Sequence, residues 1–293
     1  MIDIGSNTTR LLVAEPDRAR PGGVVEVAAH RAFVRLTAAE RAHGIPAHKV
    51  QAMCEAVAEQ ALAARAHDVA ALRVVATAAL RQAPGRELLL TQLSQAAGVK
   101  VEIISGEEEA RLAFAGATAG WAGRVPGGIG RVVVADVGGG STELACGAPG
   151  GAPSWWASLP VGSGVFAEDH FTADPPTAAE LQRAREDADA AIAAAGCPQA
   201  DVAWAVGGSA TSLRRLCGER LTADALDAAL DRVTAHPALS TAVDLGLHVE
   251  RVRLLPAGLL LLAAVARAAG CPLHVGCGGL REGVILDLLA QVG

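Results

Sequence analysis

The chain has 293 residues, of which 51% are hydrophobic, 19% are charged and 3% are aromatic, and its formal net charge is -6. This length and apolar content predict one large domain or two of ordinary size, and they exclude a disordered chain. The lack of a basic excess argues against duplex DNA as a partner, and the scarcity of aromatic rings argues against base stacking on single strands. We therefore expect no nucleic-acid partner.

Strands and helices alternate in the first part of the chain. Strands are predicted where short apolar or alternating runs occur, at residues 1–15 (two strands around a turn), 24–36, 72–76 and 99–104. Helices are predicted where apolar residues recur at helical spacing, from Pro46, over residues 88–97 and from Ser105. This alternation indicates an α/β fold.

A stretch with several Gly and Pro residues, 120–130, precedes a second part of the chain, and we divide the domains as residues 1–117 and 118–293. The later pattern predicts strands at 132–136 and 202–206, helices at 177–195 and 209–216, and a helix-rich tail. The last helix is expected to pack back on the first domain. The most apolar run, residues 254–266, is shorter than the roughly 20 residues of a membrane span, so no membrane partner is expected.

The cysteine pattern and the N-terminus predict a cytoplasmic protein. The 6 cysteines include no Cys-x-x-Cys pair and lie among apolar residues, which is typical of reduced, buried thiols. No basic region followed by an apolar run begins the chain, so no secretory signal is predicted. The sequence also lacks a Walker A loop, a Gly-x-Ser-x-Gly elbow and a His-Glu-x-x-His pair. These absences exclude the corresponding nucleotide, esterase and zinc-protease sites.

An internal repeat is the strongest pattern in the sequence. The segment from Ile2 to Leu11, IDIGSNTTRL, aligns with the segment from Ala135 to Leu144, ADVGGGSTEL. In each, an Asp precedes a turn of small residues between two predicted strands. Backbone N–H groups in such a turn form a concave row that binds anionic oxygens, and glycine permits the close approach. The residues predicted to bind phosphate here are Ser6, Asn7, Thr8, Gly138, Gly139, Gly140 and Ser141.

A third glycine-rich turn follows a predicted strand and opens a helix. It contains Gly207, Gly208 and Ser209, whose N–H groups would lie at a helix N-terminus with its partial positive charge. Taken alone, each of the three turns is as easily a plain tight turn. Together they favour a ligand made of linked phosphates.

These segments resemble the family of exopolyphosphatases and guanosine pentaphosphate phosphatases (Ppx/GppA). Further matching stretches are ATAALR at 76–81, ISGEEEARL at 104–112 and GLREG at 279–283, so the resemblance covers nearly the whole chain. It implies the duplicated actin/Hsp70/sugar-kinase (ribonuclease H-like) α/β fold, with two domains and a cleft between them. It also implies Mg²⁺-dependent hydrolysis of phosphoanhydrides.

Three consecutive glutamates follow Ser105 at the start of a predicted helix. A structural interpretation covers two of them, because Ser105 and Glu108 fit a capping box and acids are favoured in a first turn. Glu109 lies one position past that box. The resemblance implies that Glu109, in the Glu-Ala-Arg-Leu run, is the catalytic base, and that Arg81 contacts phosphate.

The repeat places Arg10 and Glu143 at equivalent positions of the two domains. Alternate residues of a strand share a face, so Arg10 would lie beside Thr8 and Glu143 beside Ser141. Arg10 is predicted to bind phosphate, whereas Glu143 is predicted to act in catalysis by holding Mg²⁺ or orienting water. Asp136 is a second candidate Mg²⁺ ligand. The alternatives are a surface ion pair for Arg10, a solvated strand residue for Glu143, and a turn cap for Asp136.

Two departures from the family pattern narrow the expected substrate. The run Val165 to Ala167 stands where Arg-Leu-Thr is common, and the helical C-terminal domain of long members has no counterpart here. We therefore expect an exopolyphosphatase that acts on short chains of inorganic polyphosphate. The alternatives are a guanosine pentaphosphate 5′-phosphohydrolase, a phosphotransferase related to acetate or sugar kinases, and a non-catalytic regulator that binds guanosine tetraphosphate. A homodimer is left open.

Overall fold

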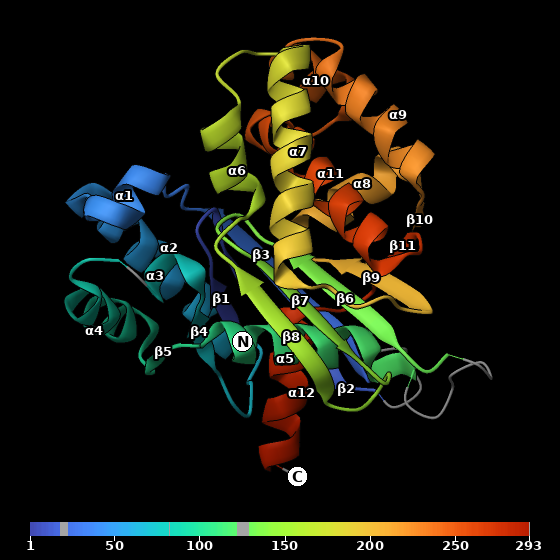
Figure 1. The fold of residues 1–293 in the computed structure, drawn as a ribbon. Helices are drawn as coiled ribbons and strands as arrows, with labels where there is room; N and C mark the ends of the chain where they lie inside the picture. The colour runs from blue at the N-terminus through green and yellow to red at the C-terminus, as the bar shows by residue number, and fades with distance from the viewer. Residues whose placement is uncertain (18–22, 82, 122–128, 293) are drawn as a thin grey trace. The chain divides into compact units, whose positions relative to one another are not determined.

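The structure, a computed structural model, describes residues 1–17, 23–81, 83–121 and 129–292. The chain divides into two compact units (Figure 1). Unit 1 is Met1–Arg124 together with Gly278–Gly293, and unit 2 is Val125–Cys277. Most of the Gly- and Pro-bearing stretch predicted to separate the domains, residues 122–128, lies outside the described residues.

Unit 1 is built on a mixed sheet in the order β3-β2-β1-β4-β5. The strands are β1 (Ile2–Ile4), β2 (Thr8–Pro16), β3 (Val24–Phe33), β4 (Val74–Ala76) and β5 (Val101–Ile103). Strands β1, β2 and β3 are antiparallel neighbours, whereas β4 and β5 run parallel to β1. Strand β4 is completely apolar and buried, as expected for a parallel strand that is covered on both faces.

Helices cover both faces of this sheet. They are α1 (Ala38–His43), α2 (Ala47–Arg65), α3 (Ala78–Arg81), α4 (Arg86–Ala97), α5 (Gly106–Thr118), the 3-10 turn η1 (Ala119–Trp121) and α12 (Leu280–Val292). The predicted apolar stripe of α2 is buried through Met53, Val57 and Ala61, in a core shared with α4. On the other face, Leu112 of α5 and Val284 of α12 pack against the sheet.

Glycines bring α5 and α12 into backbone contact. A Cβ on Gly116 would overlap the backbone of Gly279, and one on Gly283 would overlap the backbone of Leu112. Most of the GLREG stretch therefore serves helix packing, since only glycine leaves room for this approach. Residues 278–293 belong to unit 1, although the sequence division placed them within 118–293.

Unit 2 repeats the same topology. Its sheet has the order β10-β11-β9-β6-β7-β8. The strands are β6 (Val132–Val137), β7 (Thr142–Gly147), β8 (Pro153–Leu159), β9 (Val202–Val206), β10 (Arg220–Leu221) and β11 (Leu273–Val275). Strands β6, β7 and β8 are antiparallel neighbours, while β9 and β11 run parallel to β6. Without β10, the order matches the first sheet strand for strand, so the predicted duplicated α/β fold is confirmed.

The core of unit 2 is centred on one long helix. The helices are α6 (Ser163–His170), α7 (Ala178–Ala195), α8 (Gly207–Cys217), α9 (Ala223–Thr234), α10 (Ala238–Leu245) and α11 (Val249–Ala269). Helix α11 continues through Pro256 and has 21 residues, so it extends beyond the apolar run 254–266 and is, by length and composition alone, long and apolar enough to cross a membrane. In the structure, 72% of its most apolar window is buried among the other elements of unit 2. The apolar side chains of α11 therefore form part of the core of unit 2.

Two local predictions need correction. Ser105 accepts a hydrogen bond from the Glu108 amide (3.1 Å), but Glu108 does not complete the capping box, because its carboxylate pairs with Arg111 (2.7 Å). The 6 cysteines are free thiols as predicted, yet Cys277 is exposed and only Cys146 is fully buried. Burial raises the pKa of the Cys197 thiol to about 11, so that thiol is a poor nucleophile near neutral pH.

Candidate active site

The two predicted turns have the same geometry. In unit 1, Ile4 pairs with Thr9 and the Gly5 amide donates to the Thr8 carbonyl (3.0 Å). In unit 2, Val137 pairs with Thr142, and the Gly138 amide donates to the Ser141 carbonyl (2.9 Å). Each turn lies at the carboxyl end of the central parallel strand, the edge where α/β sheets bind ligands. The structural equivalence predicted from the repeat is confirmed.

Both turns present backbone amides that are available to a ligand. Within the described residues, the amides of Ser6 and Asn7 in unit 1 and of Gly139 and Gly140 in unit 2 donate no hydrogen bond. Consecutive unpaired amides of this kind form an anion-binding nest. The turns therefore have the donor pattern predicted for phosphate binding.

The start of α6 supports the second turn. The Ser163 amide donates to the Gly138 carbonyl (2.8 Å) and the Gly164 amide to the Gly139 carbonyl (2.9 Å). Gly162 lies so close that a Cβ there would be 2.5 Å from the Ser141 nitrogen. The carbonyls of Gly138 and Gly139 are thus tied to the start of α6.

The third glycine turn opens α8, as predicted. Gly207 has a φ of +81°, and a Cβ on it would overlap the Asp136 carboxylate. Glycine is therefore required both for the backbone conformation and for the approach of Asp136. Ser209 is buried, and its hydroxyl donates to the Val137 carbonyl (3.1 Å), so this side chain fastens α8 to β6. Gly208 lies between them in the first turn of the helix.

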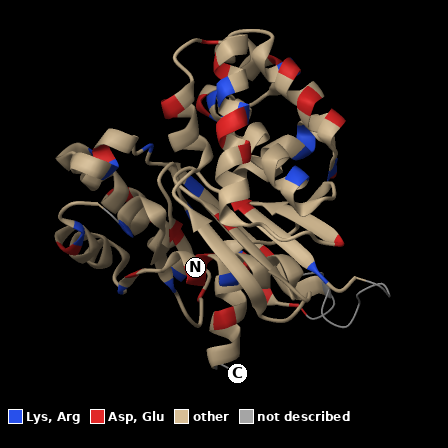
Figure 2. Ribbon diagram, viewed as in Figure 1, with Lys and Arg blue, Asp and Glu red and all other residues tan. Residues whose placement is uncertain are grey.

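Glu143 is a buried carboxylate that two hydroxyls hold. It is 2% exposed, and it accepts hydrogen bonds from Ser141 Oγ (3.1 Å) and Ser158 Oγ (2.8 Å). Asp136 on β6 and Ser158 on β8 are its direct neighbours across the sheet. Apart from Asp136 and Glu143, strands β6 to β9 carry no charged residue (Figure 2). Ser158 could not be predicted as a partner of Glu143, because its role depends on how β7 and β8 pair.

Asp136 and Glu143 suit a magnesium ion. Mg²⁺ prefers oxygen ligands and commonly takes one or two carboxylates, with water and substrate phosphates completing its shell. These two residues are opposite each other on adjacent strands, next to the amide-lined turn. No cluster of three or more His, Cys, Asp or Glu that would enclose a metal occurs in the described residues. The arrangement therefore fits a site that the substrate completes.

Glu109 and Arg81 form an ion pair in unit 1. Arg81 Nη1 donates to Glu109 Oε2 (2.7 Å) and to the Ile104 carbonyl (3.0 Å). The Glu109 side chain is 8% exposed. Arg81 follows β4 and Glu109 follows β5, so the pair lies at the same edge of the sheet as the first turn. Arg81, predicted to bind phosphate, here also fixes the orientation of the candidate base.

Arg10 lies beside the first turn, opposite the half-buried acid Asp3. Its Nε donates to Thr8 Oγ1 (3.1 Å), as alternation along the strand predicted. Asp3 faces it from β1, and one Asp3 oxygen has no hydrogen-bond partner within the described residues. Burial raises the pKa of Asp3, while Arg10 and Arg281 act in the opposite direction. Arg281 was missed as part of this charge group, although it stands in the GLREG stretch.

Within each unit, the predicted site residues of that unit lie near one another. Unit 1 places Arg10 beside the turn of Ser6, Asn7 and Thr8, and pairs Arg81 with Glu109 at the same sheet edge. Unit 2 gathers the predicted Asp136, Gly138, Gly139, Gly140, Ser141, Glu143, Gly207, Gly208 and Ser209. The functional roles assigned to these side chains stay predictions.

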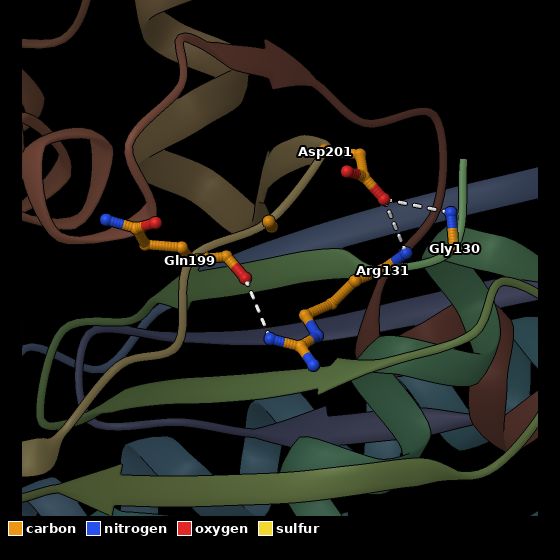
Figure 3. Close-up of a pocket in the computed structure, with 5 residues that line it drawn as sticks. Gly130, Arg131, Gln199 and Asp201 are labelled. Atoms are coloured by element: carbon orange, nitrogen blue, oxygen red, sulfur yellow. Dashed lines mark hydrogen bonds between the residues drawn. The ribbon is translucent and has the colours of Figure 1, made fainter. Parts of the chain in front are cut away.

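A pocket of about 570 Å³ in unit 2 lies away from the turns (Figure 3). It is lined by Gly130, Arg131, Gln199, Ala200 and Asp201, at the amino ends of β6 and β9. Asp201 accepts hydrogen bonds from the Gly130 and Arg131 amides (both 2.9 Å), and these lower the pKa of its carboxyl. The carboxylate is therefore occupied in holding two chain segments together.

A comparison with known families identifies the group to which this chain belongs. The model of the Ppx/GppA phosphatase family matches residues 17–292. This chain is a member of the Ppx/GppA phosphatase family. It is therefore a phosphoanhydride hydrolase.

Individual Ppx/GppA relatives agree with this assignment. The chain is 31% identical to Exopolyphosphatase 1 of Mycobacterium tuberculosis over 99% of its own length and 87% of that protein. It is 29% identical to the guanosine-5′-triphosphate,3′-diphosphate pyrophosphatase of Vibrio atlanticus, over 99% of this chain and 59% of that one.

Solved structures of Ppx/GppA proteins share the fold. An Aquifex aeolicus family member superimposes with a TM-score of 0.82 at 25% identity, covering 100% of this chain and 97% of that one. An exopolyphosphatase-like protein gives a TM-score of 0.86 at 27% identity, covering 100% and 98%.

Proposed function

We propose that this Ppx/GppA protein is an exopolyphosphatase that removes the terminal phosphate from short chains of inorganic polyphosphate. The observation that carries the proposal is the buried Glu109, held by Arg81 at the sheet edge that also bears the amide-lined first turn. The 31% identity to Exopolyphosphatase 1 of M. tuberculosis supports polyphosphate as the substrate.

In this proposal Glu109 accepts a proton from the attacking water. The ion pair with Arg81 holds the carboxylate in one orientation, which is what a positioned general base requires. The water oxygen forms a bond to the terminal phosphorus as the bond to the bridging oxygen breaks, and the leaving chain carries the electron pair. The turn amides and Arg10 donate to the phosphate oxygens, where negative charge must be stabilised during transfer.

Asp136 and Glu143 are proposed to hold Mg²⁺. The ion would supply positive charge to the phosphate oxygens, which the acidic side chains would otherwise repel. Ser141 and Ser158 fix Glu143 by hydrogen bonds to both of its oxygens, so the carboxylate has one orientation before any ligand arrives. Gly207 leaves space for Asp136 beside it.

Phosphate release from tripolyphosphate by the Glu109→Gln variant tests the proposal. The substitution keeps the size and a hydrogen-bond acceptor for Arg81 but removes the base, so we expect turnover to fall by a factor of about 100 or more. Glu107→Gln is the matched control, because Glu107 is exposed in the same first helical turn. Equal turnover by the Glu109 variant, with both variants folded, would contradict the assigned role.

Guanosine pentaphosphate 5′-hydrolysis is the second candidate, supported by the similarity to the V. atlanticus pyrophosphatase. It uses the same chemistry on a different leaving group. Side-by-side kcat/KM values for tripolyphosphate and guanosine pentaphosphate would separate the two. A higher value for the nucleotide would reverse our choice, and nucleotide binding without release of phosphate would favour a regulator.

A further inference from the structure

The strands behind the two equivalent turns carry different residues at the same register. In unit 2, one row across the sheet reads Asp136, Glu143, Ser158. In unit 1, the equivalent row reads Asp3, Arg10, Arg31. Unit 1 thus has a second arginine, Arg31, at the position that Ser158 occupies in unit 2.

Arg10 and Arg31 are direct partners across β2 and β3. Side chains at directly opposite positions share a face of the sheet, with Cβ atoms roughly 5 Å apart, and two like charges placed so are destabilising. Arg31 is exposed, whereas Arg10 is half-buried beside the turn. Asp3 faces Arg10 from β1, whereas no described strand places an acid opposite Arg31 on the other side of the pair. An anion bound to both guanidinium groups would add a counter-charge for Arg31, and arginine is well suited to phosphate oxygens.

The segment after β3 brings a third arginine to the same turn. The amides of Val34 and Arg35 donate to the Asn7 carbonyl (2.9 and 3.2 Å), so this segment is fastened to the first turn. Arg35 has a φ of +54°, and its guanidinium stacks over the Phe33 ring at 5.1 Å. Phe33 is the direct partner of Thr8 in that turn. Arg35 is therefore held close to the predicted phosphate-binding residues.

The surroundings strengthen the positive charge. Lys49 Nζ donates to the carbonyls of Val34 (3.1 Å) and Arg35 (2.7 Å), which places a further cation at this segment. Among the acids nearby, Glu40 is engaged in the capping box of α1, where it accepts from the Thr37 amide (2.8 Å). Glu26 lies farther along β3, away from the turn.

We propose that Arg31 and Arg35, together with Arg10, form a strip that binds the internal phosphates of a linear polyphosphate chain. The strip runs from Arg35, which is fastened to the first turn, to the Arg10–Arg31 pair two residues along β2 and β3. The choice of polyphosphate as the ligand rests on the proposed function. If the terminal phosphate of a polyphosphate binds at the first turn, its remaining phosphates must lie along an adjacent surface of the protein. The shorter tripolyphosphate would use less of this strip than a long chain.

Binding of long-chain polyphosphate without turnover tests the strip directly. The affinity is measured at several salt concentrations, with a chelator present to prevent hydrolysis, for wild type, Arg31→Gln and Arg35→Gln. By analogy with single-stranded nucleic acid, each lost contact should reduce the slope of log Kd against log salt by about 0.7. A purely structural arginine would not change this slope. Arg31→Lys keeps the charge and is expected to restore most of it.

A steady-state comparison gives the second readout. The ratio of KM for long-chain polyphosphate to KM for tripolyphosphate should rise about threefold for each exposed arginine removed. Arg183→Gln is the control, because Arg183 is exposed on α7 of unit 2 and its replacement changes the net charge equally. An unchanged slope and an unchanged KM ratio in both folded variants would overturn the strip while leaving the proposed hydrolysis intact. Arginine-dependent binding, with no phosphate release when Mg²⁺ is supplied in place of the chelator, would refute the hydrolysis instead.

Discussion

The two units share strand order, turn and register, yet the residues behind their turns differ in charge. Unit 1 has Arg10 where unit 2 has Glu143, and both are opposite an Asp on the neighbouring strand. The duplicated backbone thus provides an amide-lined turn twice, while one substitution at the same position makes one turn cationic and the other acidic. A cationic turn suits phosphate oxygens directly, whereas an acidic turn suits a metal ion that itself binds phosphate.

The turns also differ in how they are supported. The first is held by the irregular segment Val34–Leu36, whose amides donate to the carbonyls of Ser6 and Asn7. The second is held by the start of α6, with Gly162 in close backbone contact. The second turn is therefore fixed by the start of a helix, whereas the first is fixed by a segment outside any helix or strand.

The largest effect is expected from a substitution that removes the negative charge beside the second turn. Glu143→Gln preserves the shape of the side chain but not its charge, so we expect kcat with tripolyphosphate to fall by about 100-fold or more, together with weaker activation by Mg²⁺. Phosphate release measured over a series of Mg²⁺ concentrations checks both effects. Arg10→Gln should raise KM without changing the Mg²⁺ dependence. If both variants shifted that dependence equally, the assignment of separate roles would be wrong.

The next effect concerns stability. A Cβ at Gly162 would meet the backbone of Ser141 and Gly139 at 2.5 and 2.6 Å, so Gly162→Ala should destabilise unit 2 by about 2–4 kcal/mol. Gly196→Ala is the control, because its Cβ would meet nothing within 4 Å and only the positive φ of +70° would cost about 1 kcal/mol. Urea unfolding followed by circular dichroism measures both. Equal destabilisation would mean that α6 does not hold the turn.

Local residue patterns predicted both turns, because an Asp, small residues and alternating strands determine such a hairpin within ten residues. Ser158 and Arg31 could not be predicted in this way, since their positions depend on which strand pairs with which and in what register. The Ser105–Glu108 capping box was predicted wrongly for the same reason, because it also depends on a distant part of the chain. Arg111, which competes for Glu108, is itself held by Asp287 on α12, far along the chain.

A smaller effect is expected at Ser158. Its hydroxyl contributes one of the two hydrogen bonds to Glu143, so Ser158→Ala should lower kcat severalfold and raise the Mg²⁺ concentration needed for half-maximal activity. Ser158→Thr retains a hydroxyl and should recover part of the loss. The control is Ser154→Ala on the same strand, whose hydroxyl donates to the Cys146 carbonyl (3.3 Å). An effect of Ser154→Ala equal to that of Ser158→Ala would reveal a general weakening of β8.

The smallest effect is a difference in the pH dependence of stability between two helix capping boxes, one in each unit. Thr37 with Glu40 caps α1, and Thr177 with Glu180 caps α7. Glu180 also accepts hydrogen bonds from the amide and hydroxyl of Thr172 (2.8 and 2.7 Å). The four hydrogen bonds from Thr177 and Thr172 lower the pKa of Glu180 from 4.5 to about 2.

Because the folded state lowers the pKa of Glu180, it binds the proton less readily than the unfolded state does. The stabilisation by Glu180 is therefore complete above about pH 4.5 and is lost as the pH falls toward about 2. Glu180→Gln should reduce stability near neutral pH and flatten the fall in stability across this acidic range. Glu40→Gln, which loses fewer contacts, should leave most of that fall in place. Thermal unfolding of the two variants at a series of pH values measures the difference, and parallel curves for both would show that the extra bonds from Thr172 contribute nothing to unit 2.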